Sequence, residues 1–124
     1  MPERFDYVQN HAEGIRAKNL ILPRAAGPIL DEISLRMGKD NRITIQKKMR
    51  KAIAEQLRLS EVQVASQITI LVRKGFLERE ERGVYMVNPY FCSKCNLNAL
   101  KGLRGNWNKL LAENMDVRSI TNDK

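Results

Sequence analysis

The sequence has few of the residues on which most catalytic and metal centres depend. It contains one His and two Cys among 124 residues, too few for one chain to build a Cys/His zinc site with four ligands. No apolar run approaches the roughly 20 residues of a membrane-spanning helix. The first stretch, MPERFDYVQNHAEGIRAK, carries charges where a signal peptide needs an apolar segment. We therefore expect a cytoplasmic protein that is not an enzyme and uses no cofactor, metal or membrane.

Acidic residues are also scarce relative to basic ones. The chain has 22 Lys and Arg against 14 Asp and Glu, which gives a formal net charge of +8. A strongly basic protein attracts polyanions, so nucleic acid is the first partner to expect. The length, with 43% hydrophobic residues, suits one small domain with a limited core.

The middle of the chain has the hydrophobic spacing of three helices. The segment PRAAGPILDEISLRMGK predicts a helix from about Ala25 to Met37, after which RITI predicts a short strand. A second helix is expected in QKKMRKAIAEQLR. A third begins after Ser60, a favourable N-cap residue, and ends near Gly75. The segment FLEREERGVYMV then predicts a β-hairpin that turns at Gly83.

This order of strand, helix, sharp turn, helix and hairpin is typical of a winged helix-turn-helix. We predict a mainly α fold with a small β-hairpin wing and an additional C-terminal helix. The expected divisions are an N-terminal arm over 1–22, a winged helix-turn-helix DNA-binding domain over 23–90, and a C-terminal helix and tail over 91–124. In the arm only the apolar side chains are expected to pack, namely Phe5, Tyr7, Leu20, Ile21 and Leu22.

The C-terminal segment carries an apolar seam. Its members recur at spacings of three and four residues and predict a helix from about Asn96 to Asn114. The last ten residues show no strong pattern. Two alternatives stay open for the seam: it joins two chains in a homodimer, with DNA half-sites about one helical turn apart, or it packs against the chain's own core. The seam consists of Leu100, Leu103, Trp107 and Leu110.

The third helix has two contrasting faces. Val64, Ile68 and Leu71 form the expected buried stripe, and the side opposite to it is almost free of acid. Such a face suits base edges in the major groove, where amides and hydroxyls read donors and acceptors and aliphatic groups touch thymine methyls. A solvated face on an ordinary helix is the alternative, but exposed aliphatic residues are unusual there. With the N-cap included, the candidate contacts are Ser60, Val62, Gln63, Ser66, Thr69, Ile70 and Arg73.

Two further groups of basic residues are candidate DNA contacts. Lys47, Lys48, Arg50 and Lys51 gather at the start of the second helix, where the helix dipole disfavours positive charge. An anionic partner explains this placement better than helix stability does, although some of these side chains can serve only solubility. In the hairpin, Arg82 beside the turn is a candidate for the minor groove, and an exposed salt-bridged hairpin is the alternative.

The remaining reactive residues suggest structural roles. Cys92 and Cys95 form a CSKC spacing without a second ligand pair, so unmodified thiols are expected, and a zinc ion shared by two chains is the less favoured alternative. Tyr7, Tyr85 and Tyr90 could attack a phosphate in a strand-nicking enzyme, but such chemistry normally needs a metal held by clustered ligands. Packing with a polar tip is the favoured role for Tyr85 and Tyr90.

Across roughly residues 25 to 111, the chain resembles the RepL family of plasmid replication proteins. The resemblance rests on the helix containing IAEQL, the Ser-led helix ending in LVRKG, the segment GVYMVNPY and the later LRGNW. These last two segments place Gly83, Tyr85, Val87, Asn88, Pro89, Tyr90, Leu103, Arg104 and Trp107 at matching positions. The resemblance implies a plasmid-encoded protein that binds origin DNA and supports initiation of replication.

We therefore expect a sequence-specific protein that binds double-stranded DNA at a plasmid origin and recruits or licenses host replication proteins. A basic surface would supply salt-sensitive attraction, and one helix in the major groove would supply specificity. The alternative is a winged-helix transcriptional repressor, including one that controls plasmid copy number. An origin-nicking enzyme is the third hypothesis and the least favoured.

Overall fold

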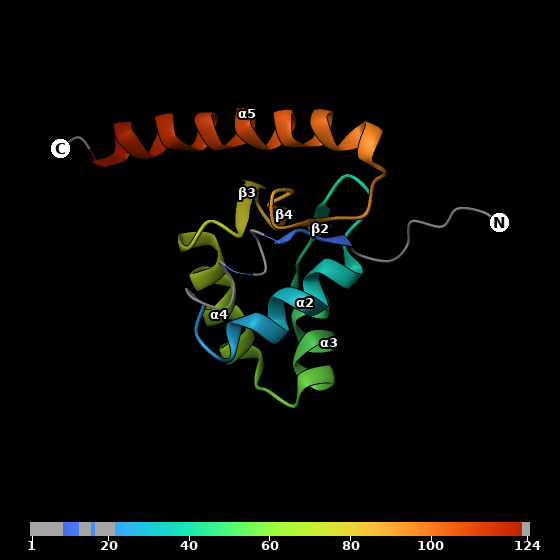
Figure 1. Cartoon of the computed structure of the whole chain (residues 1–124). Coiled ribbons are helices and arrows are strands. Elements are labelled where there is room, and N and C mark those ends of the chain that lie inside the picture. The colour runs from blue at the N-terminus through green and yellow to red at the C-terminus, as the bar shows by residue number, and fades with distance from the viewer. Residues whose placement is uncertain (1–8, 13–15, 17–21, 123–124) are drawn as a thin grey trace.

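A computed structural model describes residues 9–12, 16 and 22–122. The body runs through helix α2 (Ala26–Arg36), strand β2 (Arg42–Thr44) and helices α3 (Lys47–Leu57) and α4 (Glu61–Arg73). The hairpin strands β3 (Leu77–Glu81) and β4 (Val84–Val87) follow, then strand β5 (Cys92–Ser93) and helix α5 (Leu97–Asn122) (Figure 1). The helices and strands predicted between residues 25 and 87 are confirmed, with ends displaced by one or two residues.

The three-stranded sheet separates the helices into two layers. Its strand order is β2-β4-β3, antiparallel throughout. Helices α2, α3 and α4 lie on one side of this sheet and α5 crosses the other (Figure 1). Side chains alternate along a strand, so on β4 Val87 and Tyr85 join the main core while Met86 joins a second cluster under α5. The hairpin is therefore held from both faces.

Helix α4 is positioned by its apolar stripe and by both of its ends. Val64, Ile68 and Leu71 are buried in the main core, as the periodicity predicted. At its start, Ser60 and Gln63 form a reciprocal capping box. At its end Gly75 adopts a φ of +86°, the left-handed conformation in which glycine terminates helices. The opposite face of α4 is thereby fixed toward the outside.

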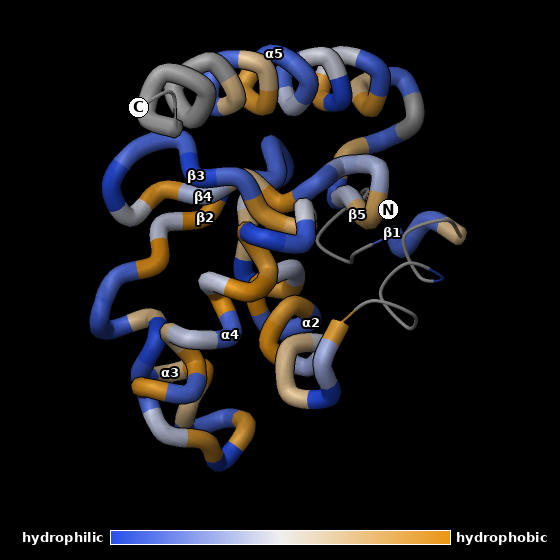
Figure 2. Tube along the Cα trace, turned by 90° about the vertical axis from the view of Figure 1, so that its left-hand side faces the viewer, coloured by the Kyte–Doolittle hydropathy of each residue, from blue (hydrophilic) through white to orange (hydrophobic). Residues whose placement is uncertain are grey.

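The apolar seam of α5 packs against the chain's own sheet. Leu100, Leu103, Trp107 and Leu110 are between 3% and 8% exposed and cluster with Met86 and Cys95. In Figure 2 the hydrophobic segments of α5 lie on the side turned toward the sheet. Of the two alternatives left open by the sequence, the structure shows the seam packed within its own chain, and a homodimer through these residues stays a prediction.

Helix α5 is longer than its apolar pattern predicted. It continues to Asn122 rather than ending near Asn114, and its C-terminal part extends past β3 (Figure 1). Once a helix is nucleated, each added residue gains a backbone hydrogen bond, so a helix can outlast the apolar stripe that anchors it. None of the described helices is long and apolar enough to cross a membrane.

Two strands, β1 and β5, lie where the sequence indicated no element. Gln9 and Asn10 form β1, which pairs antiparallel with β5 in the register Gln9↔Ser93 and Asn10↔Cys92. Backbone hydrogen bonding explains why hydropathy missed it, since both residues of β1 are polar. Leu22 packs against the main core, as expected for the arm. Phe5, Tyr7, Leu20 and Ile21 lie outside the described residues.

Candidate nucleic-acid interface

The face of α4 opposite to the core is open in the described structure. Val62 is 78% exposed, a high value for a large aliphatic side chain. Ile70 is half-buried, and the polar and basic members of this face are all exposed: Gln63, Ser66, Thr69 and Arg73. An aliphatic group surrounded by amide and hydroxyl groups matches what the major groove presents.

Two residues predicted to contact DNA, Ser60 and Gln63, also cap the start of α4. The Ser60 hydroxyl accepts the backbone N–H of Gln63 at 3.0 Å, and the Gln63 side-chain oxygen accepts the backbone N–H of Ser60 at 2.8 Å. Gln63 therefore cannot present its donor and its acceptor together to adenine while the capping box is intact. Their side-chain oxygens stabilise the start of α4, and contact of these two residues with DNA stays a prediction.

The hydroxyls on this face are oriented by the helix backbone. Ser66 donates to the carbonyl of Gln63 at 3.1 Å, and Thr69 donates to the carbonyl of Ala65 at 3.3 Å. A hydroxyl has one donor and two acceptor positions. In these conformations Ser66 and Thr69 offer acceptors to a partner, which suits the amino groups of adenine or cytosine better than it suits a phosphate.

Helix α3 carries the predicted basic residues at its first turns. Lys47, Lys48 and Lys51 are exposed and Arg50 is half-buried. The first turn has no acidic residue, and the N-cap residue Gln46 makes no side-chain cap. Helix α3 packs directly against α4, so these cations belong to the same pair of helices as the open face of α4. The helix dipole disfavours positive charge at the start of α3, so helix stability does not explain these residues.

The mixed charges of the hairpin are sorted between the two faces of the sheet. Glu78 is 1% exposed and accepts a hydrogen bond from Asn114 of α5 at 2.9 Å. Glu80 pairs with Arg42 of β2 at 2.6 Å, and this hydrogen bond is the main cause that raises the pKa of Arg42. Both carboxylates lie on the α5 side, whereas Arg79 lies on the α4 side. Two of the hairpin's three acids are therefore turned away from α4.

Arg82, the predicted candidate for a minor-groove contact, lies at the tip of the hairpin. Arg82 is exposed and precedes Gly83, which adopts a φ of +78° in the turn. Arg79 was not predicted as a site residue because the segment EREERG shows no net charge preference along the chain. Alternation of side chains along the strand is the signal that could have separated Arg79 from its acidic neighbours.

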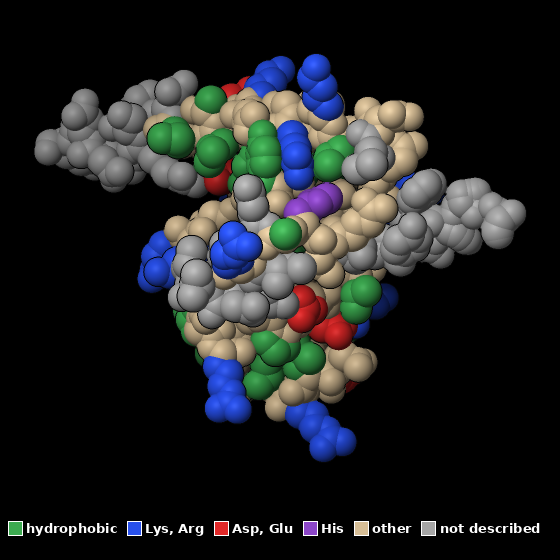
Figure 3. Space-filling model, viewed as in Figure 1, with side chains coloured by type: hydrophobic (Ala, Val, Ile, Leu, Met, Phe, Trp, Pro, Cys, Tyr) green, Lys and Arg blue, Asp and Glu red, His purple; other side chains and the backbone are tan. Residues whose placement is uncertain are grey.

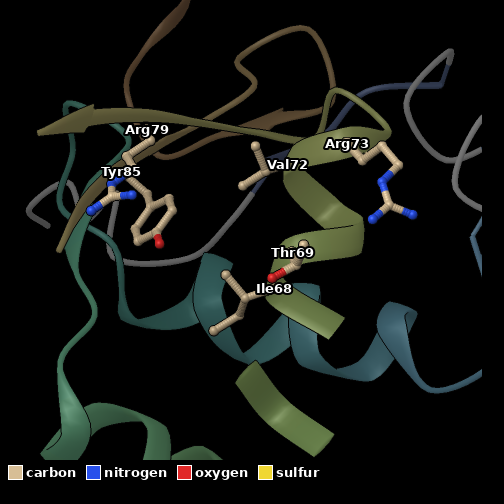
Figure 4. A pocket seen from close by; sticks show the side chains of 6 residues that line it. All are labelled: Ile68, Thr69, Val72, Arg73, Arg79 and Tyr85. Atoms are coloured by element: carbon tan, nitrogen blue, oxygen red, sulfur yellow. The ribbon is translucent and has the colours of Figure 1, made fainter. Parts of the chain in front are cut away.

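A groove runs between α4 and the hairpin. Arg79 and Tyr85 lie together on the hairpin side, while Thr69 and Arg73 come from α4 (Figure 4). Ile68 and Val72 complete the lining between these two sides. The groove therefore joins the candidate reading helix to the candidate wing, with a cation at each side.

A comparison with known families decides the affiliation. The family model described as Firmicute plasmid replication protein (RepL) matches residues 29–124. The chain belongs to the RepL family. No curated protein and no solved structure matches it. The match includes all four segments on which the resemblance rested, and it extends beyond residue 111 to residue 124.

The NPY segment of this RepL-family chain connects the hairpin to α5. Asn88 donates to the carbonyl of Gly75 at 3.0 Å and accepts the backbone N–H of Tyr90 at 2.9 Å. The Arg104 guanidinium lies 4.6 Å from the centre of the Tyr90 ring, a cation–π contact. The Tyr90 hydroxyl pairs with Asn108. Residues that carried the resemblance thus fix the loop between the two layers.

The CSKC segment has a structural role in this RepL-family chain. Cys92 belongs to the main core and Cys95 to the cluster under α5, so the two thiols are buried in different places. Lys94 between them is buried and donates from Nζ to the carbonyls of Leu35 and Met37, each at 2.7 Å. Within the described part of the chain, no three His, Cys, Asp or Glu residues are grouped to hold a metal ion.

His11 secures the start of the chain to β5. Its Nε2 lies 3.1 Å from the Ser93 hydroxyl, and its backbone N–H donates to the carbonyl of Phe91 at 2.8 Å. The histidine is visible just below α5 in Figure 3. Burial, and secondarily the positive charge of Arg104, lower the pKa of His11 below its ordinary value.

This lowered pKa predicts a pH dependence of the β1–β5 pairing. The detached segment binds a proton more readily than the docked one, so pairing is complete above about pH 6.5 and weakens as the pH falls through that value. An NMR titration of the His11 ring should give a midpoint below that of the same ring in urea-unfolded protein. A midpoint equal to the unfolded one would show that His11 is not held in this environment.

Proposed function

We propose that this RepL-family protein binds double-stranded DNA at its plasmid's origin through a winged helix-turn-helix formed by residues 23–90. In this proposal α4 enters the major groove, α3 lies across the sugar-phosphate backbone, and the β3–β4 hairpin is the wing. The observation that carries the proposal is the open face of α4, where Val62 is 78% exposed; the preceding helix α3, which packs against α4, carries exposed lysines. Family membership in plasmid replication supports the same conclusion.

Attraction and specificity come from different residues in this mechanism. Lys47, Lys48 and Lys51 neutralise phosphates and release counterions, which makes binding fall steeply with salt. Val62, Ser66 and Thr69 contact base edges, which makes binding depend on sequence. Ile70, being half-buried, lies at the margin of this surface.

The proposed role in replication is recruitment rather than catalysis. Bound at the origin, the protein would recruit or license host replication proteins. The Tyr90 hydroxyl is paired with Asn108, which supports a structural role for this tyrosine. Pairing of two DNA-bound chains through the α5 seam would require the seam side chains to leave the cluster that covers them.

The sharpest test replaces Val62 with Glu. The side chain is exposed, so folding should be unaffected, while a carboxylate facing the groove is repelled by the DNA. We expect affinity for the footprinted origin fragment of the parent replicon to fall by about tenfold or more, measured by fluorescence anisotropy.

Leu35→Glu is the matched control, because Leu35 is 58% exposed on α2 and lies outside the proposed interface. It should bind the same fragment as the wild-type protein does. Equal losses in the two variants would contradict the assignment of α4 to the major groove. Failure of the wild-type protein to bind any duplex would contradict the proposed function itself.

A further inference from the structure

The groove between α4 and the hairpin has the chemistry of an anion site. Its volume is about 480 Å³, and it is lined by two arginines and a tyrosine, together with Thr69 and two aliphatic residues. No acidic residue is among its described lining residues. Within the described part of the chain, neither Arg73 nor Arg79 has an ion-pair partner. Positive charge is therefore concentrated there without a nearby carboxylate to neutralise it.

Arg79 is held in place more firmly than an ordinary surface arginine. It lies directly across from Tyr85 in the β3–β4 register, and the Tyr85 ring packs against the main core. Figure 4 shows the Arg79 side chain beside that ring, on the hairpin side of the groove. The strand, the cross-strand ring and the α5 contacts on the other face thus fix where this cation lies.

Arg73, in the last turn of α4, is also a lining residue of the groove. In Figure 4 its side chain extends away from the Arg79–Tyr85 pair, and Val72 lies between them, so the two cations are on opposite sides of an apolar strip. A single small anion would meet only one of them in this arrangement. A polyanion with regularly spaced charges can meet both.

We propose that one strand of duplex DNA passes over this groove, with one phosphate paired to Arg79 and a neighbouring phosphate paired to Arg73. The Tyr85 hydroxyl is a second donor to the phosphate at Arg79. This inference rests on the proposed function and adds to it two contacts, Arg79 and Tyr85, that set the register of the hairpin against the helix. It also explains why Glu78 and Glu80 are turned to the opposite face.

The experiment compares Arg79→Gln with Lys109→Gln, which removes the same charge from the exposed surface of α5 on the other side of the sheet. Binding to the footprinted origin fragment is measured across a range of salt concentrations. Arg79→Gln should weaken binding about tenfold at about 0.15 M salt and lower the salt slope by about one. Lys109→Gln should change the slope by much less.

A second measurement identifies the phosphate. The origin fragment is prepared as a set in which each member carries one neutral methylphosphonate in place of a phosphate. At one position the wild-type protein should bind more weakly than it binds the unmodified fragment, whereas Arg79→Gln should bind both fragments equally. If the wild-type protein binds but Arg79→Gln responds to the methylphosphonate at every position as the wild-type protein does, the groove contact is wrong and the proposed function stands. If wild-type protein binds no duplex, the proposed function is wrong and the groove contact with it.

Discussion

Replacing Trp107 with Ala should lower the free energy of unfolding by about 3–5 kcal/mol. The ring is 3% exposed and lies in the cluster that joins α5 to Met86 of the hairpin. Removing it leaves a cavity in the buried cluster between the two layers. Urea denaturation followed by circular dichroism measures the change, because Trp107 is the only tryptophan and fluorescence would be lost with it.

The same experiment separates the two alternatives for the α5 seam. If the seam packs only within its own chain, the urea midpoint should not change with protein concentration for either protein. A seam that joined two chains would make the midpoint rise with concentration. Asn106→Ala is the matched control, since Asn106 is an exposed neighbour on the same helix. A Trp107 variant as stable as this control would contradict the packing described.

Replacing Lys94 with Ala should lower the free energy of unfolding by about 3 kcal/mol, because two charge-assisted hydrogen bonds are lost and two carbonyls lose their donor. Those carbonyls, of Leu35 and Met37, lie at the C-terminal end of α2, where the helix dipole also favours a cation. The CSKC segment thus ties β5 to the end of α2.

Lys94→Met refines this expectation, because it keeps most of the aliphatic stem and removes the buried charge. Its loss of stability should lie between that of Lys94→Ala and that of Lys101→Ala, an exposed control on α5. Thermal unfolding of the three variants under the same conditions provides the comparison. A Lys94→Ala protein as stable as Lys101→Ala would show that these hydrogen bonds do not hold the two segments together.

Periodicity was sufficient to predict the elements whose side chains divide cleanly between core and solvent. Val64, Ile68 and Leu71 defined the buried stripe of α4, and the open face followed from the same geometry. The capping box was only half predicted: Ser60 was identified as the N-cap, but Gln63 was assigned to DNA. The same amide suits both tasks, and only the fold shows that its oxygen is occupied.

The features that sequence could not supply depend on contacts between distant segments. Alternation along β3 separates Arg79 from Glu78 and Glu80, but only the fold shows which face of the sheet each of them takes. Lys94 looks like any surface lysine until β5 brings it to the end of α2, a contact across 57 to 59 positions of the chain. His11 likewise meets Ser93 across 82 positions. None of these pairings has a local periodic pattern.

The capping box at the start of α4 separates two groups of residues on the proposed DNA-contacting face. Residues that cap the helix and residues that do not should be substituted at different rates among plasmids. A change at Ser60 or Gln63 would alter helix stability together with the proposed DNA contact, so most such changes would be selected against. Changes at Val62 and Ser66 do not affect helix capping, because neither residue caps the helix. Divergence of origin specificity in related replicons should therefore accumulate at 62, 66 and 69, while the capping pair is inherited unchanged.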